Sequence, residues 1–246
     1  MDHLRLLADL QDRFLETVHR ADPDVRVPWL GRWTVRSLVV HLARIHHGAA
    51  GQARRKQETP LGRGPFDLPE LYASCALELR EALAELDPGA RAWTLLDDGV
   101  PRGDGASTEQ RGTVAFWHRR QALETLVHLW DLRTAIGDDL DVADDVWLDC
   151  LDEVVTVMHP RQVRLGRVPQ PVVRIRFAPT PTDAVLELSG AGRDAPVAVV
   201  RGPARSLALL AWGRGVPADD RLAGDGVEVT GARALAEATV RAGLTP

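Results

Sequence analysis

The spacing of apolar residues changes near residue 160, and this change constrains the fold more than any other feature of the sequence. Before it, apolar residues recur every three or four positions, which is the period of an amphipathic helix. After it, short segments alternate apolar and polar residues or are rich in β-branched residues, which is typical of strands. The sequence therefore predicts a two-domain α+β protein, with a helical domain over residues 1–160 and a small α+β domain over residues 161–246.

The helical part predicts an up-and-down four-helix bundle, with short connections or with one longer crossover, followed by one more helix before the boundary. The expected helices cover residues 2–21, 34–50, 68–86, 108–135 and 142–158. Gly137 is a suitable residue to end the fourth helix, and Pro160 is expected to end the fifth. Residues 88–107 are rich in Gly, Asp and Pro without a sustained period, which predicts a long loop of the kind that often serves as a lid.

The last third of the chain predicts a small sheet with two helices. The expected strands cover residues 172–178, 184–190, 195–202 and 227–231, and the expected helices cover residues 203–215 and 232–242.

Charge, hydropathy and cysteine content exclude several classes of protein. A net charge of -5 argues against a nucleic-acid-binding face, which is normally basic. No segment has the run of about 18 apolar residues that a membrane span needs, and the N-terminus lacks the layout of a signal peptide, so we expect a cytoplasmic protein without a membrane partner. Cys75 and Cys150 are isolated from each other and are expected to be small buried residues without a disulfide.

The strongest chemical signal is the pair Glu124 and His128, which are four residues apart in a predicted helix. This spacing places both side chains on one face, where a carboxylate and an imidazole suit a divalent ion such as zinc. The alternative is an exposed ion pair that contributes only a few tenths of a kcal/mol. Apolar neighbours at Leu123, Val127 and Leu129 favour burial, and a buried pair of this kind needs a partner.

His41 is the candidate for a third ligand because it lies in another apolar helix. His46 and His47 follow on different helical faces and are expected to be solvated. Two histidines and one carboxylate leave a coordination position open, as in catalytic zinc sites. Asp131 lies about 20° from Glu124 around the helix, where it can orient a ligand or simply be a surface acid.

Three segments together carry a resemblance to a known family. Trp33-Thr34-Val35-Arg36-x-Leu38-x-x-His41 is followed by Glu124-x-x-x-His128-x-x-Asp131 and by the acidic helix DVWLDCLDEVV. RGPARSLALLAWGR, which ends in Trp212-Gly213-Arg214, follows in the C-terminal part. The chain resembles the mycothiol-dependent maleylpyruvate isomerase family, whose N-terminal bundle is DinB-like. Its arginine-rich composition, with Lys56 as the only lysine, is typical of a GC-rich genome and fits an actinobacterial source.

The resemblance implies a zinc ion, or another divalent metal, bound by His41, Glu124 and His128, with mycothiol as the thiol cosubstrate. It implies cis–trans isomerisation of a small unsaturated acid by addition and elimination of the thiolate. It also implies that Arg214 reaches across the domain interface to bind a substrate carboxylate; the alternative is an ordinary exposed arginine.

Two other functions remain open at this point. One is a mycothiol S-transferase that acts on an electrophile in detoxification or secondary metabolism, and the other is a non-catalytic protein that binds a metal or a small ligand. An apolar helical face can belong to a core or to an interface, so the chain is expected to be a monomer or a homodimer.

Overall fold

The structure is a computed structural model of the whole chain, and it describes residues 1–54, 60–98, 112–188, 190–215 and 226–246. The chain forms two compact units. The first unit comprises Met1–Asp97 and Arg102–Asp141, and the second comprises Asp98–Pro101 and Val142–Pro246.

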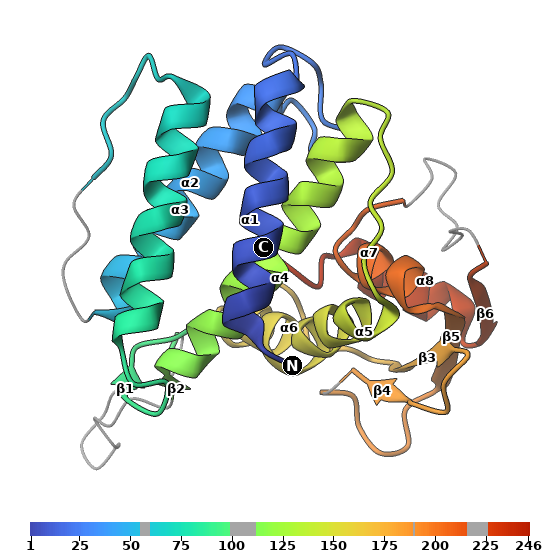
Figure 1. The fold of residues 1–246 in the computed structure, drawn as a ribbon. Helices are drawn as coiled ribbons and strands as arrows, with labels where there is room; N and C mark the ends of the chain where they lie inside the picture. Colours follow the sequence, from blue (N-terminus) through green and yellow to red (C-terminus); the bar gives the residue numbers. More distant parts are fainter. Residues whose placement is uncertain (55–59, 99–111, 189, 216–225) are drawn as a thin grey trace. The chain divides into compact units, whose positions relative to one another are not determined.

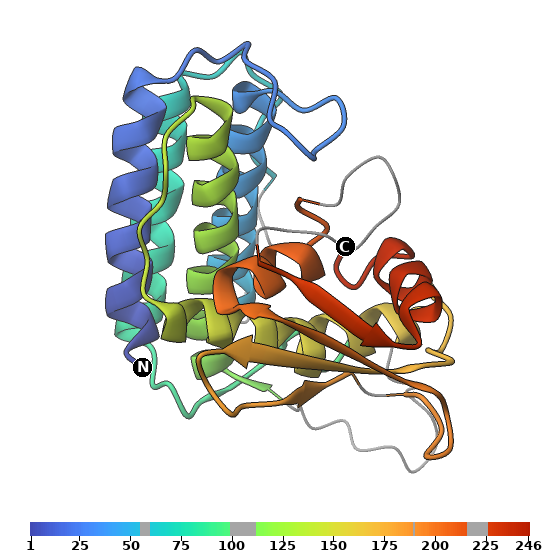
Figure 2. The ribbon, with the colours of Figure 1, turned by 90° about the vertical axis from the view of Figure 1, so that its right-hand side faces the viewer.

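The first unit is built on four long helices (Figures 1 and 2). They are α1 (His3–Arg20), α2 (Val35–Ala53), α3 (Leu68–Glu85) and α4 (Val114–Ala135). Both α1 and α2 pack against α3 and against α4, so that the four helices enclose one core. The expected four-helix bundle is confirmed.

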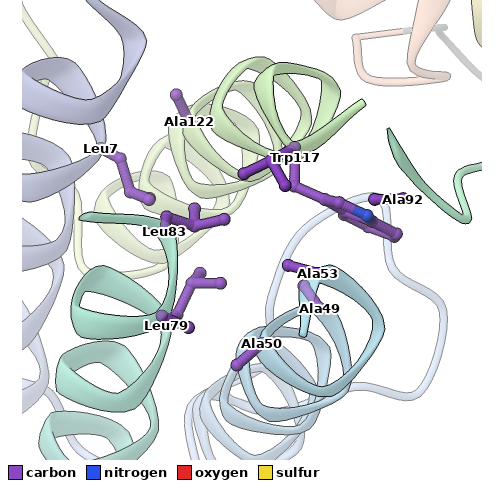
Figure 3. Close-up of a cluster of buried hydrophobic side chains, with 11 residues drawn as sticks. Leu7, Ala49, Ala50, Ala53, Leu79, Leu83, Ala92, Trp117 and Ala122 are labelled. Atoms are coloured by element: carbon purple, nitrogen blue, oxygen red, sulfur yellow. The ribbon is translucent and has the colours of Figure 1, made fainter. Parts of the chain in front are cut away.

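A cluster of buried side chains at one end of this bundle shows the direction of each helix (Figure 3). Leu7 and Trp117 lie near the starts of α1 and α4, whereas Ala53 and Leu83 lie near the ends of α2 and α3. Helices α2 and α3 therefore run in the same direction, and α3 begins at the opposite end of the bundle from the end of α2. The helices thus do not alternate strictly, and the arrangement is the one with a longer crossover connection that the sequence allowed.

Local sequence explains where several helices begin and end. The side chains of Asp2 and Asp67 cap α1 and α3 by accepting hydrogen bonds from backbone N–H groups in the first turn. Helix α4 ends at Ala135, and Gly137, with a φ of 77°, closes it as expected. The N–H of Gly137 donates to Thr134 O and that of Asp138 to Arg133 O, which is the Schellman arrangement.

The predicted loop over residues 88–107 contains a short strand. β1 (Arg91–Ala92) pairs with β2 (Gly112–Thr113) in an antiparallel hairpin, and α4 begins directly after β2. Residues 99–107 of the expected lid lie outside the described residues. The fourth helix begins at Val114, later than the expected residue 108, because β2 occupies Gly112–Thr113.

The second unit begins with a helix whose course differs from the expectation. α5 (Asp144–Glu153) continues into a π-helical turn, η1 (Val154–Met158), and then into α6 (His159–Arg164). The prediction that Pro160 ends the helix is therefore wrong. Pro160 lies in the first turn of α6, directly after the π-helical turn, where its missing N–H and fixed φ are tolerated.

A four-stranded sheet with the order β4-β3-β5-β6 forms the rest of the second unit. Its elements are β3 (Arg174–Thr180), β4 (Leu186–Glu187), β5 (Val197–Pro203), α7 (Ala204–Ala211), β6 (Glu228–Gly231) and α8 (Arg233–Arg241). β3 and β5 are parallel, and the two outer strands are antiparallel to them. Ile175, Phe177 and Val200 are buried, and α7 packs on β3 and β5. The two-domain α+β class is confirmed.

The boundary between the units falls earlier than the predicted residue 160. Helix α5 packs against α7, so residues from Val142 onward belong with the sheet and not with the bundle. Among the described residues, no helix is long and apolar enough to cross a membrane.

Candidate metal centre

Three of the predicted site residues converge within the first unit. Nε2 of His128 lies 3.2 Å from Oε1 of Glu124, and Nε2 of His41 lies 3.7 Å from the same oxygen. One potential ligand atom from each of the three residues lies within 4.8 Å of the others. The His128 and Glu124 side chains are 5% and 12% exposed, whereas His41 is 32% exposed, so the cluster is open to solvent on the His41 side.

Two helices position these side chains. Glu124 and His128 lie one turn apart on α4, and His41 projects from the middle of α2. The α2–α4 contact is fixed by a buried bond between His46 Nδ1 and Gln121 Oε1, 2.9 Å long. Trp33, just before α2, places its ring 4.8 Å from the imidazole ring of His41. Neighbouring residues therefore fix the position of α2 relative to α4 and the position of the His41 ring.

The second nitrogen of His128 has its own partner. His128 Nδ1 donates to Oδ2 of Asp131 at 3.0 Å, and Asp131 is buried. In the neutral imidazole, which is the form that binds a metal, this bond places the ring proton on Nδ1 and directs the Nε2 lone pair at the cluster. A carboxylate behind a ligating histidine is the usual arrangement around protein-bound zinc. The predicted proximity of Asp131 to this cluster is therefore observed, and its chemical role remains a proposal.

Arg120 is a member of this group that the sequence analysis missed. Its guanidinium is almost fully buried and bonds Oε2 of Glu124 at 2.5 Å. The available signal was the spacing, because Arg120 precedes Glu124 by four residues, which places both on one helical face.

The electrostatics of the cluster favour ionised Glu124. Burial alone raises the pKa of this carboxyl, but the Arg120 guanidinium and the contacts with His128 and His41 outweigh it and hold the pKa well below the ordinary value. Burial lowers the pKa of His128, yet its bonds to Asp131 and Glu124 prevail and raise that pKa to about 9. Without a metal, the proton on His128 Nε2 therefore supplies the positive charge that faces Glu124 Oε1, at the place where a cation would bind.

The donor set fits a divalent metal. Zinc binds imidazole nitrogen and carboxylate oxygen at about 2.0–2.2 Å, so tetrahedral ligand atoms are about 3.3 Å apart. The distances from His128 Nε2 and His41 Nε2 to Glu124 Oε1, 3.2 and 3.7 Å, bracket that separation. Two imidazoles and one carboxylate oxygen would leave a fourth position for a water molecule or a sulfur atom.

Two histidines behave differently from the expectation. His46 was expected to be solvated but is fully buried, because its Nδ1 bonds Gln121 across the helix interface. His47 is half-buried and pairs with Oε2 of Glu78 on α3 at 2.6 Å. Neither residue belongs to the three-residue cluster.

Arg214 lies in the second unit, at the end of α7. Its N–H donates to Leu209 O while that of Gly213 donates to Leu210 O, which closes the helix. Its guanidinium donates to Trp212 O at 2.6 Å and lies 5.7 Å from the centre of the Trp212 ring. Arg214 is 8% exposed, whereas the alternative was an ordinary exposed arginine. Its expected reach toward a substrate stays a prediction.

Both halves of the chain match a described protein family. The sequence profile of the mycothiol maleylpyruvate isomerase N-terminal domain matches residues 4–133, and that of the corresponding C-terminal domain matches residues 141–238. The chain belongs to the mycothiol maleylpyruvate isomerase family. This confirms the family resemblance, and the second profile begins where the second unit of the structure begins.

Two solved structures share the fold of this family member. One is a crystal structure of the mycothiol-dependent maleylpyruvate isomerase, with 14% sequence identity and a TM-score of 0.62. The other is a histidine-to-alanine variant of that enzyme, with 13% identity and a TM-score of 0.63. Each alignment covers 93% of this chain and 91% of the solved chain. No curated protein sequence matches the chain significantly.

Proposed function

We propose that this protein is a metal-dependent, mycothiol-dependent isomerase that converts a small cis-unsaturated acid of the maleylpyruvate type into its trans isomer. The observation that carries the proposal is the convergence of His41 Nε2 and His128 Nε2 on Glu124 Oε1, in a chain of this family. The proposed ligands of zinc, or of another divalent metal, are these three residues.

A bound divalent metal would lower the pKa of a coordinated thiol, so that the nucleophilic thiolate is present near neutral pH. The protein's own residues account for the rest of the site. Asp131 holds His128 in the tautomer that offers Nε2, and Glu124 supplies a charged oxygen. Because His41 is the most exposed of the three, the thiol would arrive from its side.

The proposed reaction consumes no oxidant or reductant. The thiolate sulfur forms a bond to one carbon of the conjugated double bond, and the π electrons move toward the adjacent carbonyl group. The former double bond is then a single bond that rotates. When the carbon–sulfur bond breaks, the electrons return to form the trans double bond, and the thiolate is released unchanged. Arg214 is the proposed ligand of the substrate carboxylate, because a guanidinium binds such a group through two parallel hydrogen bonds.

The direct test is turnover of maleylpyruvate by the zinc-loaded protein with and without mycothiol, followed by proton NMR of the two isomers. We expect a trans product only when mycothiol is present, with no net loss of thiol. His41→Ala and His128→Ala should abolish turnover. Asp9→Asn, which alters an exposed pair with Arg13 on α1, is the matched control and should retain full activity.

The same experiment separates the other two functions. If a stable thioether conjugate accumulates in proportion to the mycothiol that is lost, the protein is an S-transferase and not an isomerase. Tight metal binding without any change in substrate or thiol would favour a binding protein, and would refute the proposed isomerase activity on this substrate.

A further inference from the structure

Arg120 is buried beside the candidate ligand Glu124, on the same helix and one turn earlier. The residue is only 3% exposed, and its guanidinium bonds Oε2 of Glu124 at 2.5 Å. Burying an arginine is costly unless its charge is paired and hydrogen-bonded. A charge in this position is therefore a specific feature of the site, and its partner is the carboxylate that faces both histidines.

The two oxygens of Glu124 have different surroundings. Oε1 faces Nε2 of His128 and Nε2 of His41, whereas Oε2 is held by Arg120. A carboxylate can bind a metal through one oxygen or through both. Rotation of the group to present both oxygens would break the bond to Arg120 and leave its charge buried without this partner.

We propose that Arg120 is a positioning residue that makes Glu124 a one-oxygen metal ligand, with Oε1 on the metal and Oε2 on the guanidinium. The inference rests on the proposed metal site. It predicts a four-coordinate centre with one position left for the thiol, whereas a two-oxygen Glu124 would occupy or crowd that position. Arginine suits this role because it stays protonated throughout the working pH range and holds an oxygen with a planar set of donors.

Cobalt(II) provides a test, because the intensity of its visible d–d absorption reports coordination number. The cobalt-loaded wild type should show the strong band of a four-coordinate ion. In Arg120→Met, Glu124 Oε2 is released, so we expect the band to weaken toward that of a five-coordinate ion. Zinc affinity should fall about tenfold, as is usual when the partner of a metal ligand is removed. Arg120→Lys retains a charged donor to Oε2 and should keep most of the band intensity.

The matched control is Arg80→Met, which removes a partly exposed arginine of the same bundle from its 2.9 Å bond with Asp12. It should leave both the spectrum and the zinc affinity unchanged. A folded Arg120→Met protein with the wild-type spectrum would overturn the inference, whatever its affinity.

If Arg120→Met does not fold, the crystal structure of the zinc-loaded wild type decides the question. Oε1 at bonding distance and Oε2 on Arg120 would support the proposal, and both oxygens on zinc would overturn it. A wild type that binds neither cobalt nor zinc would instead refute the metal site itself.

Discussion

His128 uses its two ring nitrogens for different contacts, and this division suggests a test of its partner. Nδ1 donates to Asp131, which leaves Nε2 facing Glu124. In Asp131→Asn, the amide oxygen can still accept that hydrogen bond, but the negative charge that makes the imidazole a stronger donor is lost. We expect zinc affinity to fall by about tenfold, measured by competition with a chromophoric chelator.

The exposed acid Asp9 again provides the control, since Asp9→Asn should bind zinc as the wild type does. An Asp131→Asn protein with wild-type zinc affinity would show that Asp131 is only a structural acid.

His46 provides a pH-dependent test of bundle stability. Burial lowers its pKa from the ordinary 6.5 to about 4. Between these two values the unfolded chain takes up a proton that the folded chain does not, so stability is fully present above about pH 6.5 and is lost as the pH falls toward 4. Between pH 7 and pH 5 the loss from this one residue should be about 2 kcal/mol.

Denaturant unfolding of the metal-free protein at several pH values measures this effect. His46→Gln removes the titrating group, so its free energy of unfolding should fall about 2 kcal/mol less than that of the wild type between pH 7 and pH 5. Leu79→Ala is the control, because it destabilises the bundle core without removing a titrating group and should retain the wild-type slope. Equal slopes for His46→Gln and the wild type would contradict the assignment of a neutral buried His46.

At the level of helices, small residues on α2 make room for the ring of Trp117 on α4. The ring lies in one buried cluster with Ala49 and Ala53 (Figure 3), and its Nε1 donates to Trp93 O at 2.9 Å. Ala49→Leu would overfill this core and should lower the free energy of unfolding by about 1–3 kcal/mol. Leu77→Ala, at a half-exposed position on α3, should change it by less than about 0.5 kcal/mol. An equally stable Ala49→Leu protein would show that the cluster is loosely packed.

Helices were predictable because their apolar residues repeat with the helical period and their ends carry local signals. Asp67 before α3 and Gly137 after α4 are examples, since each acts through contacts within one or two turns. The π-helical turn before Pro160 was not predictable in this way. A proline normally ends a helix, and only the local change of hydrogen bonding in η1 brings Pro160 into the first turn of a new helix.

The site residues also divide into those whose position follows from the local sequence and those whose position depends on distant residues. Glu124 and His128 share one helical face, so their proximity followed from the sequence. The burial of His46 depends on Gln121, which is 75 positions away on another helix. Arg120 had a suitable spacing, but a sequence does not distinguish a buried arginine from the many exposed ones in so arginine-rich a chain.

At the scale of the whole molecule, all three candidate ligands, together with Arg120 and Asp131, belong to the first unit. The second unit contributes Arg214 and starts at Val142, earlier than periodicity predicted. Helix α5 has the same apolar period as the bundle helices, and only its packing against α7 reveals its domain. Metal binding is therefore expected to depend on the bundle, and the proposed substrate recognition by Arg214 would depend on the second unit.

The metal content of the purified protein, after zinc loading and removal of free ion, tests the metal centre directly. We expect one zinc ion per chain in the wild type, and little or none in folded His41→Ala, Glu124→Ala and His128→Ala proteins. A wild type that retains no divalent metal would contradict the metal centre. Retention of zinc in all three variants would show that other residues bind it.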